Sequence, residues 1–283
     1  MLNLHNIDKT YKNVIALKDV SLTFQPGIYG LIGPNGAGKS TLLNIIASVL
    51  KPTQGKVYFE KQNIELLKSE YRKVLGLMPQ TQSGYDDFSG YAFLFYMAAL
   101  KNIGQEEASQ QINHLIQQVS LEDVIHRKIK TYSGGMRQRL MFAQTLLGNP
   151  KIVILDEPTA GLDPFERIKM RNYISEVSKD KIVIIATHVM QDIEAIVDQI
   201  ILIKDGYIIK MASPQELMRK VNGFVYEKKI DLHKLQYYSE NYLVSQVIKR
   251  EDDVIIRYID KNIKNEKYSV FANLDEVYLY YMV

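Results

Sequence analysis

Residues 33–41 of this 283-residue chain read GPNGAGKST, and this stretch decides the fold. It fits the P-loop pattern of a glycine, four residues, a second glycine, a lysine and a hydroxyl side chain. The apolar run before it predicts a buried strand, and the run after it predicts a helix with an apolar face. Glycines let successive backbone N–H groups turn toward an anion, and a helix start adds positive potential. We therefore expect a phosphate cradle formed by Gly33, Pro34, Asn35, Gly36, Ala37, Gly38, Lys39, Ser40 and Thr41.

Two side chains of this stretch indicate which phosphate it binds. Lys39 supplies a full positive charge for a β and a γ phosphate. Ser40, at the expected helix start, can place its hydroxyl on Mg²⁺, a hard cation that keeps several waters and takes few protein oxygens. ATP with Mg²⁺ fits both side chains.

Three further apolar runs each end in a polar residue that phosphate chemistry uses. Residues 152–155 precede Asp156 and Glu157, residues 182–187 precede His188, and residues 74–79 precede Gln80. Short continuous apolar runs are typical of strands buried in a parallel sheet. Ligands of such sheets bind outside the carboxyl ends of the strands, so we expect these side chains to meet the phosphate cradle in one crevice.

Hydrolysis of a γ phosphate needs charge neutralisation and a positioned water, and we expect these residues to provide both. Asp156 would hold Mg²⁺ through its water shell, and Glu157 would polarise the attacking water. Gln80 would complete the metal shell or orient that water. His188 would either bind the γ phosphate or hold Glu157 in place; taken singly, a Gln or His at a strand end is more often a solvated or capping residue.

A second glycine-rich segment, residues 132–139 (YSGGMRQR), also opens an expected helix. Ser133 is a good N-cap, and Ser133, Gly134 and Gly135 at an exposed helix start can bind an anion. An ordinary serine-capped helix is the alternative. Because one nucleotide needs only one cradle, the second would serve a phosphate held by another molecule, most simply a second copy of such a chain.

The chain resembles the nucleotide-binding subunits of ABC transporters over about its first 215 residues. The motifs that carry the resemblance are Walker A (33–41), the Q-loop Gln80, the signature YSGGM (132–136), Walker B (152–157), the D-loop AGLD (160–163) and the switch His188. The family usually has LSGGQ as its signature, so Tyr132 and Met136 are departures, from which we expect no loss of function. The resemblance implies that Tyr11 stacks on adenine, and that the signature of one subunit closes over the ATP on the Walker A of the other.

Composition agrees with a cytoplasmic globular chain, and the resemblance implies a peripheral position at the cytoplasmic face of the cell membrane. There are no cysteines, the net charge is +3, and neither a signal peptide nor a stretch of the roughly 20 apolar residues that a spanning helix needs is visible. We expect the membrane pathway to lie on a separate permease chain, and we expect no nucleic-acid partner.

The expected fold is α/β: a P-loop NTPase core with a parallel sheet, an N-terminal antiparallel β subdomain and an inserted helical subdomain at about residues 82–145. Residues 1–218 would form this nucleotide-binding domain, and residues 219–283 a small α+β extension. In the extension, residues 254–258 predict a strand, and residues 273–280 a closing helix that starts at Asn273. The extension resembles that of bacterial export ATPases; it would cap the core, or make a dimer or regulatory contact.

The sequence therefore predicts an ATPase subunit that forms a dimer, homomeric or heteromeric, and powers a membrane exporter. A soluble ABC ATPase acting on ribosomes or DNA, and the ATPase of an importer, are the alternatives. The chain has one cassette and no heptad insertion, which argues against the soluble classes. The exposed aromatics near Tyr85 and Phe88 belong either to the core of the helical subdomain or to a surface that receives the permease.

Overall fold

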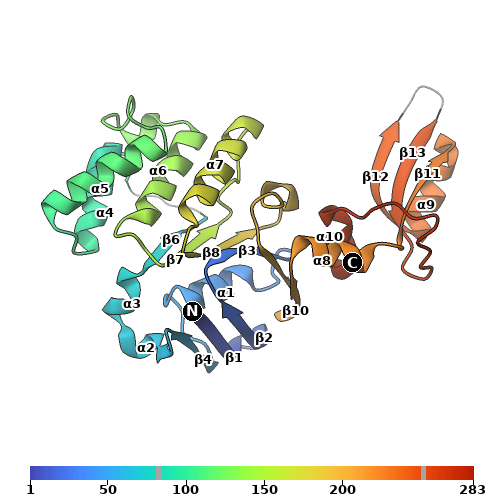
Figure 1. Ribbon diagram of the computed structural model, residues 1–283, viewed down its shortest axis with the longest axis horizontal. Coiled ribbons are helices and arrows are strands. Elements are labelled where there is room, and N and C mark those ends of the chain that lie inside the picture. Colours follow the sequence, from blue (N-terminus) through green and yellow to red (C-terminus); the bar gives the residue numbers. More distant parts are fainter. Residues whose placement is uncertain (81–84, 250–252) are drawn as a thin grey trace. The chain divides into compact units, whose positions relative to one another are not determined.

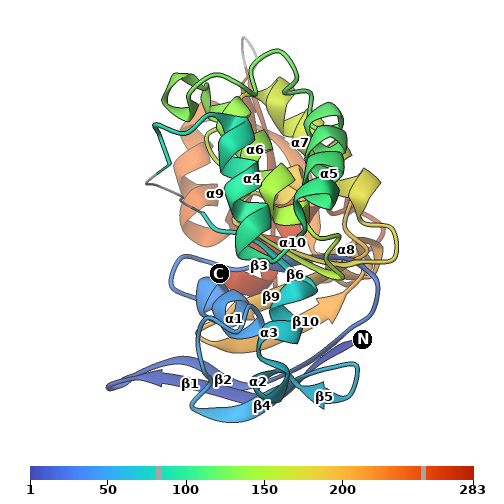
Figure 2. The same cartoon turned by 90° about the vertical axis from the view of Figure 1, so that its left-hand side faces the viewer.

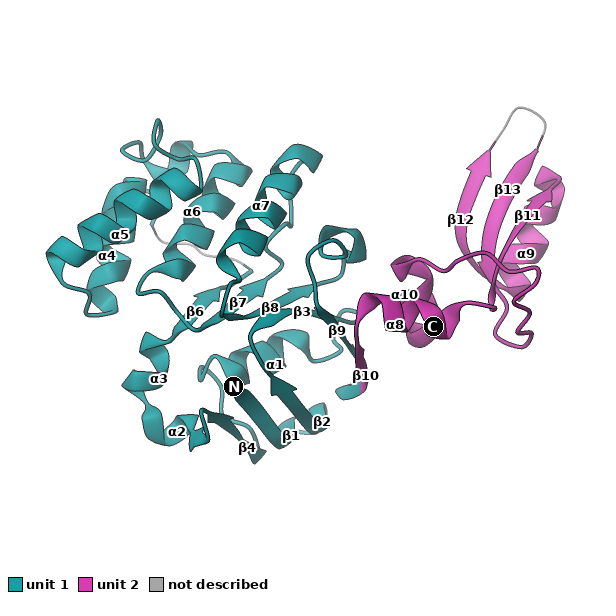
Figure 3. Cartoon of the chain, viewed as in Figure 1, with its two compact units in different colours: residues 1–208 teal, residues 209–283 magenta. Residues whose placement is uncertain are grey.

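A computed structural model describes residues 1–80, 85–249 and 253–283 of the chain. The chain divides into two compact units, residues 1–208 and residues 209–283 (Figure 3). The nucleotide-binding domain expected over residues 1–218 remains a prediction. The start of the helical insertion, expected near residue 82, lies outside the described residues.

A six-stranded sheet forms the centre of the fold, in the order β10-β9-β3-β8-β7-β6 (Figure 1). Its strands are β3 (Gly27–Ile32), β6 (Leu75–Met78), β7 (Ile152–Asp156), β8 (Ile182–Thr187), β9 (Gln199–Lys204) and β10 (Tyr207–Ala212). The pairs β3–β8, β3–β9, β7–β8 and β6–β7 are parallel. Ile32 pairs with Thr187, and Asp156 with Ala186, so the carboxyl ends of β3, β7 and β8 lie level with one another.

A separate antiparallel sheet is built from the N-terminal residues. It contains β1 (Leu2–Tyr11), β2 (Val14–Phe24), β4 (Gln54–Phe59) and β5 (Gln62–Asn63), in the order β2-β1-β4-β5. Leu2, Leu4 and Ile7 of β1 are buried. This sheet is the antiparallel β part that the sequence predicts.

Helices cover the central sheet and form a separate group beside it (Figure 2). The bounds are α1 (Lys39–Ile46), α2 (Ile64–Leu67), α3 (Ser69–Lys73), α4 (Gly90–Leu100), α5 (Gln105–Gln118), α6 (Gly134–Leu146) and α7 (Pro164–Val177), with 3₁₀ turns η1 (Ile129–Thr131) and η2 (Met190–Asp192). Helices α4, α5 and α6 contact one another, and α6 also contacts β6. The α/β class with a parallel sheet, an antiparallel sheet and a helical region is confirmed. No described helix combines the length and the apolar character needed to cross a bilayer.

The unit of residues 209–283 has a small sheet and helices of its own. Its elements are α8 (Pro214–Val221), β11 (Val225–Ile230), η3 (Leu232–Lys234), α9 (Leu235–Asn241), β12 (Leu243–Lys249), β13 (Val254–Ile259) and α10 (Leu274–Met282), with strand order β11-β13-β12. The predicted strand at 254–258 and the helix start at Asn273 are both confirmed. Glu276 is fully buried and receives a hydrogen bond of 2.8 Å from Nε of Arg257, so a complete ion pair stabilises the start of α10.

Candidate active site

The loop between β3 and α1 can be built only with glycine at two positions. A Cβ at Gly33 would lie 2.1 Å from the carbonyl oxygen of Ile203, and one at Gly38 would lie 2.5 Å from that of Ala16. Gly38 also has a φ of +105°, a conformation that side chains strongly disfavour. The neighbouring strands therefore fix the shape of this loop, and its backbone is pre-formed around the start of α1.

Lys39 is the first residue of α1, and its side chain is buried against the same loop. Its Nζ donates hydrogen bonds of 2.6 Å to the carbonyl oxygen of Gly33 and 3.0 Å to that of Pro34. Burial lowers the pKa of Lys39, while the negative charges of Glu157 and Asp156 oppose this shift. The ammonium group is thus held at the loop by two carbonyls.

Asp156, at the end of β7, lies beside the start of α1. The Ser40 hydroxyl donates a hydrogen bond of 3.3 Å to Oδ2 of Asp156. Burial raises the pKa of Asp156, and the hydrogen bond from Ser40 opposes that shift. The described residues contain no cluster of three His, Cys, Asp or Glu side chains. One carboxylate with one hydroxyl is nevertheless a hard-oxygen donor set that fits Mg²⁺, since this ion is bound by few protein oxygens together with phosphates and water.

Glu157 follows Asp156 and is fixed from two sides. Its Oε2 accepts a hydrogen bond of 3.1 Å from the Thr187 hydroxyl, and its Oε1 lies 2.8 Å from Nδ1 of His188. Its backbone has a φ of +52°, and its N–H donates to the carbonyl oxygen of Ala186 at 2.8 Å. The carboxylate is therefore held in one orientation at the edge of the sheet, although the His188 side chain itself is 60% exposed.

A pocket of about 200 Å³ brings most of the predicted residues together. It is lined by Ala16, Asn35, Gly36, Gly38, Lys39, Ser40, Thr41, Gln80, Asp156 and Glu157. His188 joins this group through Glu157, and Gly33 and Pro34 through the ammonium group of Lys39. Tyr11 lies at the end of β1 and is 44% exposed, with the Nζ of Lys9 5.1 Å from the centre of its ring. Within the described residues, the lining of the pocket includes neither Tyr11 nor the second glycine cradle.

The second cradle forms the start of α6, with Ser133 as its N-cap. The backbone N–H of Met136 donates to the Ser133 hydroxyl at 3.2 Å, and the Ser133 N–H lies 3.4 Å from the sulfur of Met136. Met136 thus completes a capping box with a weak acceptor. Tyr132 is buried, and its hydroxyl donates to the carbonyl oxygen of Val124 at 2.9 Å. The tyrosine that replaces the family's leucine is therefore a packing residue.

Sequence reasoning missed three polar residues that support the site. Thr187, at the end of β8, contacts Glu157 through its hydroxyl and receives the N–H of Val189 at 3.1 Å. Thr159 donates a 2.7 Å hydrogen bond to the buried Asp192. A hydroxyl residue directly before His188 in an otherwise apolar run was the one available signal for Thr187. Asp192 gave none, because its partners lie far away in the sequence.

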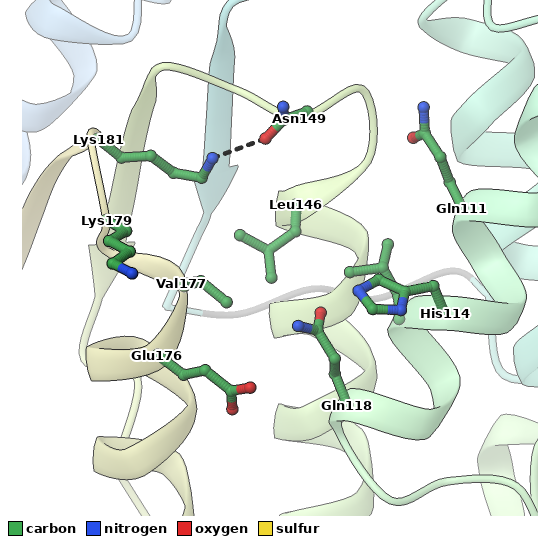
Figure 4. Close-up of a pocket in the computed structure, with 10 residues that line it drawn as sticks. Gln111, His114, Gln118, Leu146, Asn149, Glu176, Val177, Lys179 and Lys181 are labelled. Atoms are coloured by element: carbon green, nitrogen blue, oxygen red, sulfur yellow. Dashed lines mark hydrogen bonds between the residues drawn. The ribbon is translucent and has the colours of Figure 1, made fainter.

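A larger pocket, of about 400 Å³, lies away from this site (Figure 4). It lies between α5 and the ends of α6 and α7, where Nζ of Lys181 donates to Oδ1 of Asn149 at 2.6 Å. Its described lining includes none of the predicted phosphate or metal residues. The candidate active site is therefore not the larger of these two pockets. It is the pocket where the predicted phosphate and metal residues lie together at the strand ends.

Comparison with known proteins identifies the family. Residues 17–160 match the profile described as ABC transporter. The chain belongs to the ABC transporter family. The uncharacterized ABC transporter ATP-binding protein YxlF of Bacillus subtilis is 35% identical over 223 residues, which are 78% of this chain and 73% of YxlF. ABC transporter A family member 8 of Dictyostelium discoideum is 34% identical over 210 residues, 74% of this chain but only 25% of that longer protein.

The fold of this ABC protein is also found in solved structures. The ATP-binding cassette MJ0796, solved as a dimer in a post-hydrolysis state with ADP and phosphate, is 28% identical and superimposes with a TM-score of 0.68. The match covers 75% of this chain and 98% of that cassette. This chain is therefore an ABC ATPase, a member of a family whose ATP-binding domains dimerise and work with membrane permeases.

Proposed function

We propose that this ABC ATPase binds ATP with Mg²⁺, hydrolyses it, and thereby powers a separate membrane permease, an exporter. ATP closes a dimer of two ATPase subunits, and hydrolysis reopens it. The observation that carries the catalytic part is the position of Glu157, held by Thr187 and His188 beside Asp156, Ser40 and Lys39.

The phosphate cradle would bind the triphosphate of ATP. Backbone N–H groups of the loop and of the start of α1 would bind the β phosphate, and Lys39 would exchange its two carbonyl partners for β and γ phosphate oxygens. Ser40, Asp156 and Gln80 would hold Mg²⁺, which neutralises charge that develops on the phosphates. Tyr11 would stack on the adenine ring.

Glu157 is the proposed general base. Its carboxylate would take a proton from the attacking water, and the Thr187 hydroxyl and His188 fix the direction in which it points. His188 can donate Nδ1–H to Glu157, and in its neutral form the other ring nitrogen is then an acceptor. The 2.8 Å contact supports the role of holding Glu157 in place.

The second cradle would complete the site of a partner subunit. Ser133, Gly134 and Gly135 would bind the γ phosphate of the ATP held by the partner's Walker A, so two subunits would enclose two ATP molecules. Packing within this chain gives no reason for glycine at 134, because a Cβ there would meet its nearest atom, the oxygen of Gly161, at 4.0 Å. Close approach by another subunit supplies a reason.

The Tyr85 side of a pocket of about 320 Å³ next to Gln80 is the proposed docking place for the permease, while Gly134, which also lines this pocket, would face the partner subunit. Tyr85 lines it, and the rings of Phe88 and Tyr96 lie 5.9 Å and 6.0 Å from that of Tyr85. Gln80 lines both this pocket and the phosphate pocket, so it could couple the two. The ATPase would then sit at the cytoplasmic face of the cell membrane. Replacing Tyr85 or Phe88 with Ala should reduce co-purification of the permease, and unchanged co-purification would remove this docking role.

The catalytic proposal is tested by Glu157→Gln, with Glu176→Gln on the exposed end of α7 as the matched control. Turnover should fall by at least about 100-fold, because the amide cannot accept the proton. ATP should still bind, and gel filtration in ATP should show an accumulated dimer. Turnover at the level of the control would remove Glu157 from the mechanism.

Transport coupling needs a second experiment. Recovery of the chain in the membrane fraction should depend on a co-expressed permease. The substrate gradient formed in inverted vesicles should then show export, which the resemblance of residues 219–283 to export ATPases supports. Tight co-sedimentation with ribosomes would instead favour a soluble ABC ATPase.

A further inference from the structure

A second cation-rich pocket lies outside the proposed ATP site. It has a volume of about 240 Å³ and lies between the end of α1, strand β4 and the short helices α2 and α3. Four cationic side chains and a single carboxylate, Glu65, line it: Lys51, Lys56, Lys68 and Arg72 are the cations. Its formal charge therefore equals the net charge of the whole chain, +3.

The positive charge of this pocket is largely unpaired. Among the described residues of the pocket, the ion pair is that of Lys51 Nζ with Glu65 at 4.0 Å, and the Lys51 side chain is 86% exposed, so the pair is weak. The side chains of Lys56, Lys68 and Arg72 form no ion pair with any residue in the described parts of the chain. Bringing like charges together in this way is unfavourable unless an anion compensates them.

Capping of α1 does not explain the cations. Basic side chains often gather at a helix C-terminus because they bind its free carbonyls. Here the chain itself already satisfies those carbonyls: the Tyr71 hydroxyl donates to Ile46 at 2.7 Å, and the N–H groups of Val49 and Leu50 donate to Asn44 at 2.9 and 3.0 Å. The cationic groups are therefore free to bind an external anion.

Two strongly exposed apolar residues are next in sequence to residues that line the pocket. Leu66 is 79% exposed beside Glu65, and Val49 is 68% exposed between Ser48 and Leu50 of the lining. Cations next to exposed aliphatic side chains are typical of surfaces that contact phospholipid headgroups. The planar guanidinium of Arg72 matches two phosphate oxygens at once, and the hydroxyl of Ser48 offers one more donor.

We propose that this pocket binds a phosphate group, carried either by an anionic phospholipid or by a small soluble phosphate ester. The pocket contains none of the residues proposed to bind ATP, so this inference stands apart from the proposed reaction. A lipid phosphate here would add a direct membrane contact to one made through a permease.

The test compares two probes on the full chain with saturating ADP and Mg²⁺, so that the P-loop is already occupied. Sedimentation with vesicles of phosphatidylcholine, with and without phosphatidylglycerol, measures lipid binding. Calorimetric titration with glycerol 3-phosphate measures binding of the soluble ester. The double variant Lys56→Gln/Arg72→Gln removes two cations of the pocket, and Lys179→Gln/Lys220→Gln removes the same charge elsewhere. Arg72→Lys keeps the charge but loses the planar fork.

In the lipid case, the pocket variant should bind phosphatidylglycerol vesicles roughly tenfold to 30-fold more weakly than the control variant. In the soluble case, glycerol 3-phosphate binding should fall by a similar factor while vesicle binding is unchanged. Arg72→Lys should weaken binding only of the probe that the double variant affects. It replaces the double variant in the test if that variant does not fold. Equal behaviour of pocket and control variants with both probes would overturn the proposal. If the double variant does not fold, wild-type binding of both probes by Arg72→Lys would overturn it.

Discussion

Two glycine-rich segments open a helix in this ABC ATPase, and they differ in why they need glycine. In the first, before α1, a Cβ at Gly33 or Gly38 would collide with backbone oxygens at 2.1 and 2.5 Å. In the second, before α6, a Cβ at Gly134 would meet nothing closer than 4.0 Å, and one at Gly135 would meet the flexible side chain of Glu166 at 2.8 Å.

The first segment forms a site within this chain, whereas the second is proposed to complete the ATP site of a partner subunit. The first segment is shaped by β2 and β9 of its own fold, and Lys39 is already held within it. The second is a helix start that Ser133 caps. Substitutions in the two segments should therefore fail in different ways.

Lys39→Ala should have the largest effect on nucleotide binding. It removes a charged donor to the phosphates, worth about 3 kcal/mol, so the Kd for ATP should rise on the order of 100-fold. Calorimetric titration measures this directly, with the exposed Lys179→Ala as control. An unchanged Kd would show that the buried ammonium of Lys39 serves the loop alone.

Gly38→Ala should destabilise the fold itself. A residue with a Cβ cannot hold a φ of +105° without strain, and the clash with Ala16 adds to it, so the free energy of unfolding should fall by about 2–3 kcal/mol. Urea denaturation followed by circular dichroism tests this. Stability equal to that of Gly134→Ala would break the comparison between the two segments.

Gly134→Ala should leave folding intact and impair only the assembled enzyme. Alanine favours the helix, so stability should stay the same or rise by up to about 1 kcal/mol. Turnover and ATP-dependent dimer formation should fall on the order of tenfold to 100-fold, because the methyl group blocks close approach to the partner's phosphate. Turnover assays and gel filtration in ATP measure the two effects. Wild-type turnover would argue that the second segment is only a helix cap.

Met136→Gln should have the smallest effect. An amide oxygen replaces the thioether sulfur that now lies 3.4 Å from the Ser133 N–H, which should stabilise α6 by about 0.5 kcal/mol. Turnover should change by less than about twofold, since the backbone at Ser133, Gly134 and Gly135 stays in place. Parallel thermal denaturation and activity assays of the two proteins check this. A large gain in turnover would mean that the family's glutamine contributes beyond capping.

Local patterns in the sequence predicted much of this structure. The apolar runs before Asp156 and His188 became β7 and β8, and the glycine pattern before Lys39 became the loop to α1. These features follow from short-range preferences: glycine for unusual backbone angles, serine and asparagine for caps, and continuous apolar residues for buried strands. The same patterns predicted Asn273 as the start of α10.

Contacts between distant segments could not be predicted in the same way. That Gly33 must lack a side chain depends on Ile203, which lies 170 residues away on β9. The hydroxyl of Tyr132 lies against Gly90, the first residue of α4, and the cationic pocket depends on how α2 and α3 return to β4. Such contacts are set by the packing of whole elements, for which a single sequence carries no direct signal.

The contact between Thr159 and Asp192 has a mechanical consequence. Thr159 follows Glu157 on the turn after β7, and Asp192 lies on the turn after His188, so their 2.7 Å hydrogen bond links the two turns. Arg167 of α7 lies 3.5 Å from Asp192 and joins that helix to the same link. A shift of α7 would therefore be felt at both turns, and so at Glu157 and His188, through contacts that involve no residue of the phosphate pocket.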